Sequence, residues 1–232
     1  MRNHLSVILP TFREKNSIRN CALRFSQLEI VEEILVINNN AEIGTNEEVF
    51  GISKVRVINE NIQGYGAAIK RGLKEARMDK IAICEPDGTF EPRDILKLAS
   101  YSDDKDLVLG SRTISTFIYS GANMGRFLKW GNWFVAKLIE ILYNTTYLSD
   151  VGCTFRIVSS RLARKVLEEE TTDRGYFGLQ MMLIAIKEKY SYVQIPVHYG
   201  PRVGNSSSTG SMVKATILGI EMIIEVLKKR LI

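Results

Sequence analysis

The sequence predicts an α/β fold with a mostly parallel central sheet flanked by helices. Through the first half of the chain, apolar runs of about five residues alternate with amphipathic stretches of helical periodicity. Such alternation is typical of parallel sheets, because each crossover between strands needs a helix that covers a face of the sheet. The expected strands span residues 5–9, 33–37, 54–58, 80–84 and 106–110, and the expected helices between them span residues 14–28, 66–77 and 94–100.

The same pattern predicts where a ligand would bind. In an open parallel sheet the binding crevice lies beyond the carboxyl ends of the strands. The segments that follow the expected strands therefore form the candidate site, and they span residues 10–14, 38–40, 59–66, 85–90 and 111–112.

The second half of the chain has a different pattern. Residues 124–143 are expected to form a strongly apolar helix that carries both tryptophans, Trp130 and Trp133, together with basic residues. Such a helix either lies at a membrane interface or packs on the sheet. Residues 211–232 form a second amphipathic stretch, whose three terminal basic residues either complement the helix dipole or meet anionic headgroups. We therefore expect a domain over residues 1–210, and a helix over 211–232 that belongs to it or contacts a membrane surface.

The uneven charge of the chain favours an anionic partner. Residues 1–111 carry 15 Lys and Arg against 17 Asp and Glu, whereas residues 112–232 carry 16 against 9. Excess positive charge fits a phosphate, a membrane surface or nucleic acid, or is simply solvated. The sequence contains no nucleic-acid-binding motif, so a nucleic-acid partner is not expected.

Cysteine usage and hydropathy predict the compartment. Three cysteines without a CxxC spacing favour a reduced environment. The apolar run at the start is too short for a signal peptide, and no run of about 18 apolar residues is present to span a bilayer. These features predict a cytoplasmic protein that is soluble or peripheral on the cytoplasmic membrane face.

Two carboxylates follow the fourth expected strand, in Glu85-Pro86-Asp87. Mg²⁺ and similar hard cations prefer one or two carboxylates together with phosphate oxygens. Such a cation would neutralise a diphosphate leaving group. The alternative is that Asp87-Gly88 merely forms a turn.

Glycines precede the helix expected at residues 66–77. Gly64 and Gly66 would let the backbone approach an anion at the N-terminus of this helix. The third glycine of the dinucleotide fingerprint is missing, because Ile69 stands in its place, so a hydride-transferring enzyme is disfavoured.

Three arginines follow expected strands or lie in loops of the second half: Arg112, Arg156 and Arg202. The planar guanidinium suits bidentate binding of phosphate. Taken one at a time, each of these arginines could instead be a solvated surface residue. Their shared position near expected strand ends or in loops favours phosphate binding.

Together these segments resemble glycosyltransferase family 2, whose members have the GT-A fold. The similarity runs from Ser6 to about Ser208, with the elements in the family's order. The matching segments of the first half are VILPTFRE (7–14), LVINNN (35–40), NIQGYGAAIKRG (61–72), EPD (85–87) and GSR (110–112). In the second half, DVGCTFR (150–156), VQIPV (193–197) and RVGNSS (202–207) are similar to bacterial and archaeal polyprenyl-phosphate glycosyltransferases related to dolichyl-phosphate mannose synthase.

The resemblance implies a role for each matched residue. Asp87, with Glu85, would hold Mg²⁺ or Mn²⁺ on the diphosphate of a nucleotide-diphosphate sugar donor. That donor would be bound by Pro10, Thr11, Glu14, Asn38, Asn61, Gly64, Gly66 and Glu85. The phosphate of a lipid acceptor would be bound by Arg112, Arg126, Arg156, Arg202 and Ser206. The alternative for Arg112, Arg156 and Arg202 is that they hold the donor diphosphate. The resemblance implies an inverting hexosyltransferase, whose catalytic residues would be Asp87, Arg112 and Arg202.

Four residues depart from the family pattern: Arg13, Asn38, Glu85 and Gln180. Gln180 stands where many relatives carry a carboxylate, and an amide cannot act as a general base. A hydroxyl acceptor needs such a base, whereas a phosphate acceptor is already anionic at neutral pH. We therefore expect a polyprenyl (dolichyl or undecaprenyl) phosphate oxygen to attack the anomeric carbon directly.

Two other functions are compatible with the sequence. One is a glycosyltransferase that acts on a hydroxyl acceptor in cell-surface polysaccharide or glycolipid synthesis, with Asp150 as the candidate base. The other is a catalytically weak nucleotide-sugar-binding protein, which the departures from the family pattern would explain.

Overall fold

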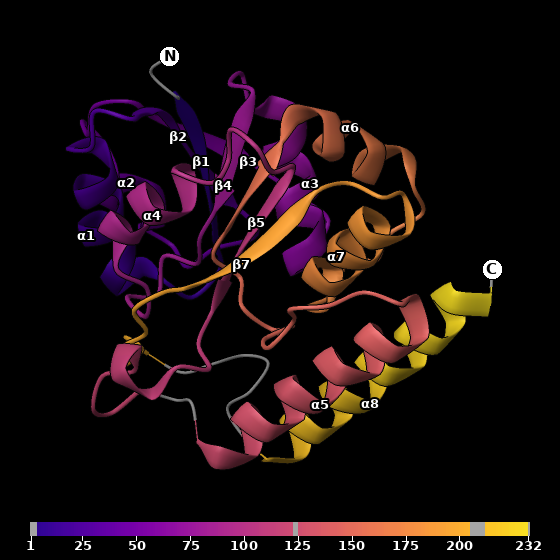
Figure 1. Ribbon diagram of the computed structural model, residues 1–232. Coiled ribbons are helices and arrows are strands. Elements are labelled where there is room, and N and C mark those ends of the chain that lie inside the picture. Colours follow the sequence, from indigo (N-terminus) through magenta and orange to yellow (C-terminus); the bar gives the residue numbers. More distant parts are fainter. Residues whose placement is uncertain (1–3, 123–124, 205–211, 232) are drawn as a thin grey trace.

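A seven-stranded mixed sheet forms the centre of the computed structural model, which describes residues 4–122, 125–204 and 212–231 (Figure 1). The strands are β1 (Leu5–Thr11), β2 (Val31–Asn38), β3 (Val55–Asn59), β4 (Lys80–Ile83), β5 (Leu107–Ser111), β6 (Arg156–Ser159) and β7 (Tyr192–Pro196). Their order in the sheet is β3-β2-β1-β4-β6-β5-β7. Strand β6 runs antiparallel to β4 and β5, and the other pairs are parallel. The predicted mostly parallel sheet is therefore confirmed.

The expected elements of the first half are present. All five strands lie within two residues of their expected bounds, and the three helices form as α1 (Lys15–Ser26), α3 (Tyr65–Glu75) and α4 (Ile95–Ala99). The described α-helices not expected from the sequence are α2 (Thr45–Glu48), α6 (Ser160–Glu168) and α7 (Phe177–Lys187), and two short 3-10 helices, η1 (Pro92–Asp94) and η2 (Ser115–Phe117), are also present. Every side chain of β1 is buried, because helices cover both faces of the sheet, and this explains its continuous apolar run.

Two apolar cores lie on opposite faces of the sheet. Along β1 the side chains alternate between them, so that Val7 and Leu9 join one core and Ile8 joins the other. Helices α1 and α4 cover the first face, and α3, α6 and α7 cover the second (Figure 1). This arrangement leaves the carboxyl ends of β1, β2 and β4 free to form a site.

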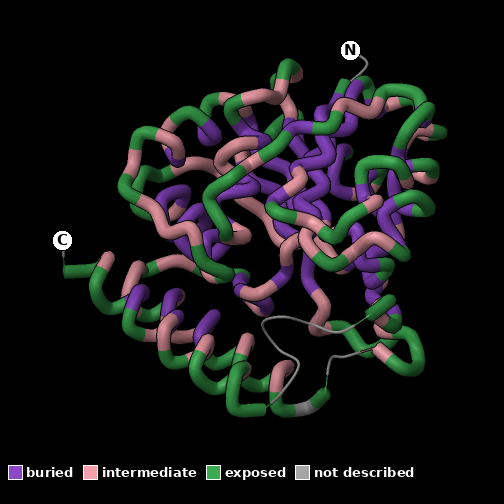
Figure 2. The backbone as a smooth tube through the Cα atoms, turned by 180° about the vertical axis from the view of Figure 1, so that it is seen from behind, coloured by how far each residue is buried: buried purple, intermediate pink, exposed green. Residues whose placement is uncertain are grey.

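Two long helices lie side by side at one edge of the molecule. They are α5 (Arg126–Tyr143) and α8 (Met212–Leu231), and they run in the same direction (Figure 1). The Tyr143 hydroxyl donates to the Val226 carbonyl at 3.0 Å. Each helix buries residues on one side and exposes the rest, as Figure 2 shows. Both helices were expected, and within the described part of the chain no helix is long and apolar enough to cross a membrane.

Candidate active site

A cleft of about 370 Å³ opens at the carboxyl ends of the strands, at the edge that the sequence predicted. Its walls come from the ends of β1 and β4, the glycine loop before α3 and the segment before α7. The lining includes Pro10, Thr11, Glu14, Asn39, Gly64, Glu85, Arg112, Arg174, Tyr199 and Arg202.

Asp87 is almost fully buried beyond the end of β4, with 1% of its surface exposed. Its Oδ1 accepts hydrogen bonds from the Thr89 backbone N–H at 2.9 Å and the Thr89 hydroxyl at 2.6 Å, and these close a turn in which Gly88 has a φ of 83°. Its Oδ2 is also buried and, among the described residues, has no donor aligned for a hydrogen bond. A buried carboxylate oxygen without an aligned donor suits a bound cation.

Arg202 faces three carboxylates from within the cleft. Its Nη1 lies 2.8 Å from Asp87 Oδ2 and 3.5 Å from Glu85 Oε2, and its Nη2 lies 3.0 Å from Glu14 Oε1. Arg202 lines the cleft whereas Asp87 does not, so the guanidinium separates Asp87 from the space where a ligand would enter. The sequence left open whether Arg202 meets the acceptor phosphate or the donor diphosphate, and here it contacts the carboxylates expected on the donor side.

Three carboxylates, those of Glu14, Glu85 and Asp87, face the single guanidinium of Arg202. Burial raises the pKa of Glu85, and the charges of Asp87 and Glu14 raise it further, so that it reaches about 8 although Arg202 lowers it. Excess negative charge of this kind favours the binding of a divalent cation.

The residues present fit a divalent cation that is shared with a ligand. Within the described ranges, no three His, Cys, Asp or Glu side chains converge closely enough to hold an ion alone. Asp87 and Glu85 would therefore hold the cation together with phosphate oxygens, as Mg²⁺ and Mn²⁺ sites often do. A cation there would supply charge that stabilises a departing diphosphate.

Glu14 shapes the turn after β1. Its Oε2 accepts hydrogen bonds from the backbone N–H groups of Phe12 and Arg13, at 2.7 and 2.9 Å. Because its other oxygen faces Arg202, this carboxylate is committed to the turn and the guanidinium. Pro10 and Thr11 line the cleft as expected, and the buried Thr11 hydroxyl lacks a hydrogen-bond partner among the described residues.

The asparagine that borders the cleft after β2 is Asn39, not Asn38. The Asn38 side chain bonds to Asn46 and to the Ala41 backbone, outside the cleft lining. Asn39 is buried and binds the Glu60 and Ile62 carbonyls, while its Oδ1 accepts from the Gly64 N–H at 2.8 Å. Sequence reasoning missed Asn39 because three consecutive asparagines gave no signal of which one points inward. Asn61, also expected to bind the donor, lies outside the lining.

Gly64, which caps α3, and Gly66, in its first turn, admit protein backbone rather than a ligand. A Cβ at Gly64 would lie 2.2 Å from the Asp173 carbonyl oxygen, and one at Gly66 would lie 2.3 Å from that of Thr172. The Gly66 N–H is already bonded to the Asp173 oxygen at 2.8 Å. Gly64 lines the cleft but Gly66 does not, so the expected donor contact at Gly66 is not supported. This close packing brings Arg174 to the cleft wall.

Arg112 is bound to Asp150 where the cleft meets a second cavity. Its Nε and Nη2 donate to the two carboxylate oxygens at 2.8 and 3.0 Å, and its backbone N–H donates to Oδ2 at 2.9 Å. The Arg112 side chain retains 11% exposure and lines both cavities. It is therefore held in a fixed orientation with access to ligands on both sides.

The expected role of Arg156 in phosphate binding is wrong for a geometric reason. Its side chain points into the core, with 2% of the residue exposed, and its guanidinium donates to the carbonyls of Gly178 and Cys153. Burial lowers the pKa of this guanidinium. Arg156 joins β6 to α7 and cannot reach a ligand. Two other expected phosphate ligands lie outside the described residues: the side chain of Arg126 and the whole of Ser206.

Asp150, the candidate base named from the sequence, is engaged with Arg112. Burial raises the pKa of Asp150, but Arg112 and the hydrogen bonds from the Arg112 and Gly152 backbone outweigh this and hold the pKa below its usual value. Gln180 is also buried, where it accepts from the Thr172 N–H and donates to Glu225 of α8. Asp150 therefore remains an ionised partner of Arg112, which argues against its expected alternative role as a base.

An apolar pocket of about 290 Å³ lies between α5 and α8. Its lining includes Phe127, Phe134 and Val135 from α5, with Ala215, Gly219 and Ile223 from α8. The pocket and the cleft share Arg112, Gly152, Tyr199 and Leu218. Arg112 is the positively charged residue at this junction. Its guanidinium carbon lies 5.1 Å from the centroid of the Tyr199 ring. Tyr199 was not expected as a site residue, because no motif in the sequence marks it.

Comparison with known proteins assigns the class and then the family. A solved structure of glucosyl-3-phosphoglycerate synthase from Mycobacterium tuberculosis, in complex with Mn²⁺, UDP and glucosyl-3-phosphoglycerate, superposes with a TM-score of 0.74 at 13% identity, covering 99% of this chain and 81% of that one. The mixed sheet with its cleft at the strand ends is thus the GT-A fold. The chain belongs to glycosyl transferase family 2, which it matches over residues 6–167.

Two relatives of known name are similar over most of this chain. The low-salt glycan biosynthesis hexosyltransferase of Haloferax volcanii is 25% identical over 209 residues, which cover 88% of this chain. The chain spans about half of that relative, 49% of its length. A dolichyl-phosphate beta-glucosyltransferase of Trichomonas vaginalis is 20% identical over 242 residues, covering 92% of this chain and 71% of that protein.

Proposed function

We propose that this protein transfers a hexose from a nucleotide-diphosphate sugar to the phosphate of a polyprenyl lipid, with inversion at the anomeric carbon. The observation that carries the proposal is the junction at Arg112, where a cleft that suits a nucleotide sugar meets an apolar pocket. An amphiphilic acceptor would place its phosphate at this arginine and its chain between α5 and α8.

The donor occupies the cleft at the carboxyl ends of β1 and β4. Asp87 and Glu85 hold a divalent cation on the diphosphate, and Thr11 and Asn39 lie on the walls that face the nucleotide. Family membership and the Mn²⁺ and UDP bound to a protein of the same fold support this assignment.

The lining of the apolar pocket supports a lipid acceptor. The structurally similar glucosyl-3-phosphoglycerate synthase has a small, polar product, glucosyl-3-phosphoglycerate. The pocket beside Arg112 is instead lined by aromatic and aliphatic side chains. Such a lining favours an alkyl or isoprenoid chain. The name of the Trichomonas vaginalis relative supports a lipid phosphate as well.

The reaction follows from these positions. An oxygen of the acceptor phosphate forms a bond to the anomeric carbon while the bond from that carbon to the donor diphosphate breaks. No proton has to be removed, which agrees with the engagement of Asp150 and Gln180 in other hydrogen bonds. Arg112 aligns the incoming phosphate, so positioning and electrostatics supply most of the acceleration.

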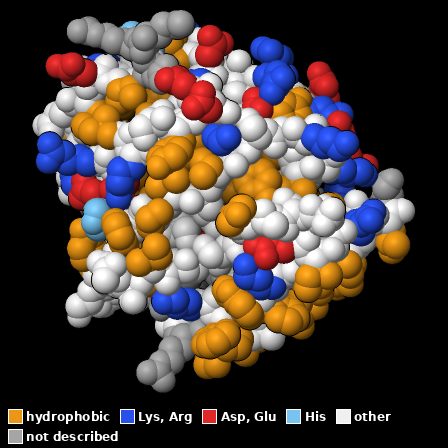
Figure 3. Space-filling view, in the orientation of Figure 1, with side chains coloured by type: hydrophobic (Ala, Val, Ile, Leu, Met, Phe, Trp, Pro, Cys, Tyr) orange, Lys and Arg blue, Asp and Glu red, His pale blue; other side chains and the backbone are white. Residues whose placement is uncertain are grey.

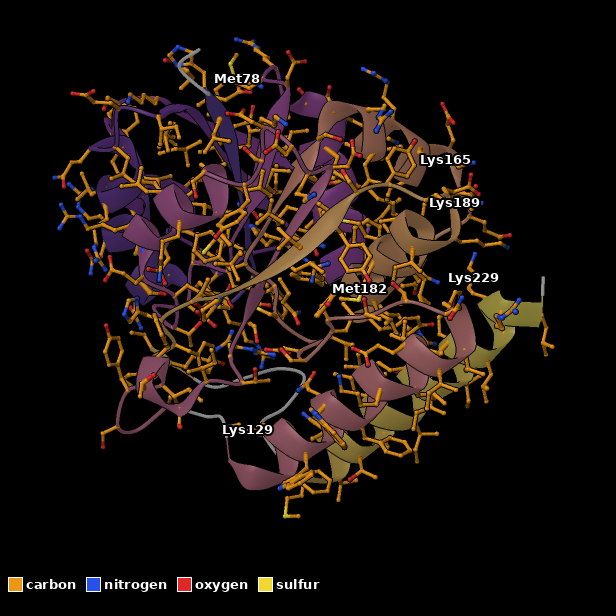
Figure 4. All side chains as sticks on the ribbon, in the orientation of Figure 1. Met78, Lys129, Lys165, Met182, Lys189 and Lys229 are labelled. Atoms are coloured by element: carbon orange, nitrogen blue, oxygen red, sulfur yellow. The ribbon has the colours of Figure 1, made fainter. Side chains whose placement is uncertain are left out.

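The helix pair of α5 and α8 is proposed to contact the surface of a membrane. Exposed apolar residues form one stripe on each helix: Phe127, Trp130, Phe134 and Ile141 on α5, and Val213, Ile217, Ile220, Ile224 and Leu227 on α8. Orange side chains gather along this lower edge in Figure 3. Lys129 and Lys229 lie at opposite ends of the helix pair (Figure 4). Aromatic and basic residues beside an apolar stripe suit a headgroup interface, and the C-terminal helix over 211–232 would then serve both the domain and the membrane contact.

The proposal is tested by nucleoside diphosphate release from UDP- and GDP-sugars. Release should require both Mn²⁺ or Mg²⁺ and a short polyprenyl phosphate. Equal release with a hydroxyl acceptor would favour polysaccharide or glycolipid synthesis instead. Binding of a donor without any turnover would favour a nucleotide-sugar-binding protein.

A further inference from the structure

Arg202 occupies a position that a donor-bound cation would also need. Its guanidinium faces Glu14, Glu85 and Asp87 at once, and only 18% of its side chain is exposed. Asp87 itself is 1% exposed and does not line the cleft. A cation that approaches from the cleft therefore meets Arg202 before it meets Asp87.

The two positive charges compete for the same oxygen. Asp87 Oδ2 is 2.8 Å from Arg202 Nη1. A cation bonded to that oxygen at about 2.1 Å could be no farther than about 5 Å from Nη1, so the two charges would repel strongly at this buried position. The contact between Nη1 and Oδ2 is also poorly aligned, because Oδ2 has no hydrogen bond among the described residues. At Oδ2 the guanidinium is thus held by charge rather than by a directed hydrogen bond, whereas its Nη2 donates a hydrogen bond to Glu14 Oε1 at 3.0 Å. The contact at Oδ2 is therefore the one that a cation can displace.

We propose that Arg202 and the divalent cation exchange places at Asp87 when the donor binds. Arg202 neutralises the carboxylates when no cation is bound, and it moves to the donor diphosphate when the cation takes Oδ2. This inference rests on the donor half of the proposed function, and it is independent of the acceptor.

The local backbone allows such an exchange by side-chain rotation. The Val203 N–H donates to the Asp87 carbonyl at 2.9 Å, which holds the residue after Arg202 beside the turn that carries Asp87. The guanidinium therefore stays in the cleft, within reach of any diphosphate that is bonded to the same cation. The planar guanidinium can donate two hydrogen bonds to phosphate oxygens, so Arg202 exchanges its contact with Asp87 for one with the diphosphate.

The exchange predicts two effects of opposite sign in Arg202→Gln. Calorimetric titration with Mn²⁺ alone should show an affinity at least about threefold higher than in wild type, because the carboxylates lose their competing cation. Titration with UDP or GDP in saturating Mn²⁺ should show an affinity at least about tenfold lower, because the diphosphate loses its arginine. Mn²⁺ should also raise the melting temperature of the variant by more than it raises that of wild type.

Arg174→Gln is the matched control, since it removes the same charge from the same cleft. Arg174 pairs with Glu221 of α8 and with none of the three carboxylates, so its loss should leave the affinity for Mn²⁺ alone nearly unchanged. Arg202→Lys keeps the charge without the fork, and should bind Mn²⁺ alone about as wild type does. This second variant keeps the test valid if Arg202→Gln does not fold.

The outcomes separate this inference from the proposed function. An unchanged or lower affinity for Mn²⁺ alone in Arg202→Gln, with nucleotide binding still dependent on Mn²⁺ in wild type, would overturn the exchange and leave the donor assignment intact. An equal gain in affinity for Mn²⁺ in Arg174→Gln would also overturn it, because loss of any positive charge near the cleft would then explain the effect. Absence of Mn²⁺ binding to wild type, with and without nucleotide, would overturn both.

Discussion

The Arg112 guanidinium donates two hydrogen bonds to the Asp150 carboxylate, with Nε–Oδ2 at 2.8 Å and Nη2–Oδ1 at 3.0 Å. Arg112 is the arginine that the cleft and the apolar pocket share. The Asp150 side chain is fully buried, and Arg112 keeps a small exposed area. Asp150 therefore fixes the orientation of the Arg112 side chain.

Removal of the Asp150 carboxylate should destabilise the protein and also disturb the acceptor site. Asp150→Ala leaves a buried guanidinium without its partner, so the free energy of unfolding should fall by about 3 kcal/mol. Urea denaturation checks this value. Glu169→Gln, which breaks the half-buried surface pair with Lys165, should change the unfolding free energy by less than about 1 kcal/mol. Equal effects of the two changes would contradict the role given to Asp150.

Gly66 should tolerate no side chain, because its space is taken by the segment before α7. Gly66→Ala places a Cβ 2.3 Å from the Thr172 oxygen, so we expect a loss of about 2 kcal/mol in unfolding free energy and weaker donor binding. Gly131→Ala in α5 meets no atom within 4 Å and should instead be stabilised by about 0.5 kcal/mol. Thermal and urea unfolding of the two variants should therefore shift in opposite directions.

Glu85 should make stability depend on pH in one direction. The pKa of Glu85 in the folded protein, about 8, is above the unfolded value. The contribution of protonated Glu85 to the free energy of unfolding is therefore fully present below about pH 4 and is lost as the pH rises through 8. Glu85→Gln cannot ionise. In the presence of a chelator, its stability relative to wild type should therefore be greater at pH 9 than at pH 5, by at least about 1 kcal/mol. The same difference at both values would refute the raised pKa.

A side chain that fills the apolar pocket should act on the acceptor alone. Gly219 lines this pocket, and its Cβ position has no atom within 4 Å. Gly219→Leu should therefore fold and should raise the KM for a polyprenyl phosphate by about tenfold, while the donor KM stays near its wild-type value. Steady-state kinetics with each substrate varied in turn measures both. A change confined to the donor KM would mean that the pocket does not hold the acceptor.

The exposed stripe of the helix pair should determine binding to vesicles. Trp130 is 66% exposed, and Trp130→Glu should abolish most cosedimentation with vesicles that contain anionic lipid. Phe50→Glu makes the same kind of change at an 86% exposed aromatic residue after α2, away from the helix pair. Binding should survive this control. Loss in both variants, or in neither, would remove the helix pair as the contact surface.

Local sequence patterns predicted the first half of the fold well because it depends on local periodicity. Strands such as β1 are buried on both faces, and their apolar runs stand out from the helices around them. Strand β6 was missed because its four residues, Arg156–Ser159, run directly into α6. Its antiparallel place between β4 and β5 depends on distant contacts that no local pattern encodes.

The site was predicted as a region more successfully than as a set of residues. Strand ends identified the edge of the sheet where Glu85 and Asp87 lie, and the family resemblance added Arg202 from a loop of the second half. The structure brings these three residues together. The direction of a side chain could not be read from residue type. Arg156 points into the core, and Asn39 takes the place expected for its neighbour, because packing and backbone twist decide which side chain turns inward.

The central claim, that the acceptor is a lipid phosphate, is tested most directly by a matched pair of acceptors. A short polyprenyl phosphate and the polyprenol of the same chain would be incubated with Mn²⁺ and a donor that the protein binds, and lipid products would be identified by mass spectrometry. The account predicts a hexosyl phosphate lipid from the first acceptor and no product from the second. A glycosylated polyprenol, or a product only with an acceptor that lacks both phosphate and lipid, would contradict it.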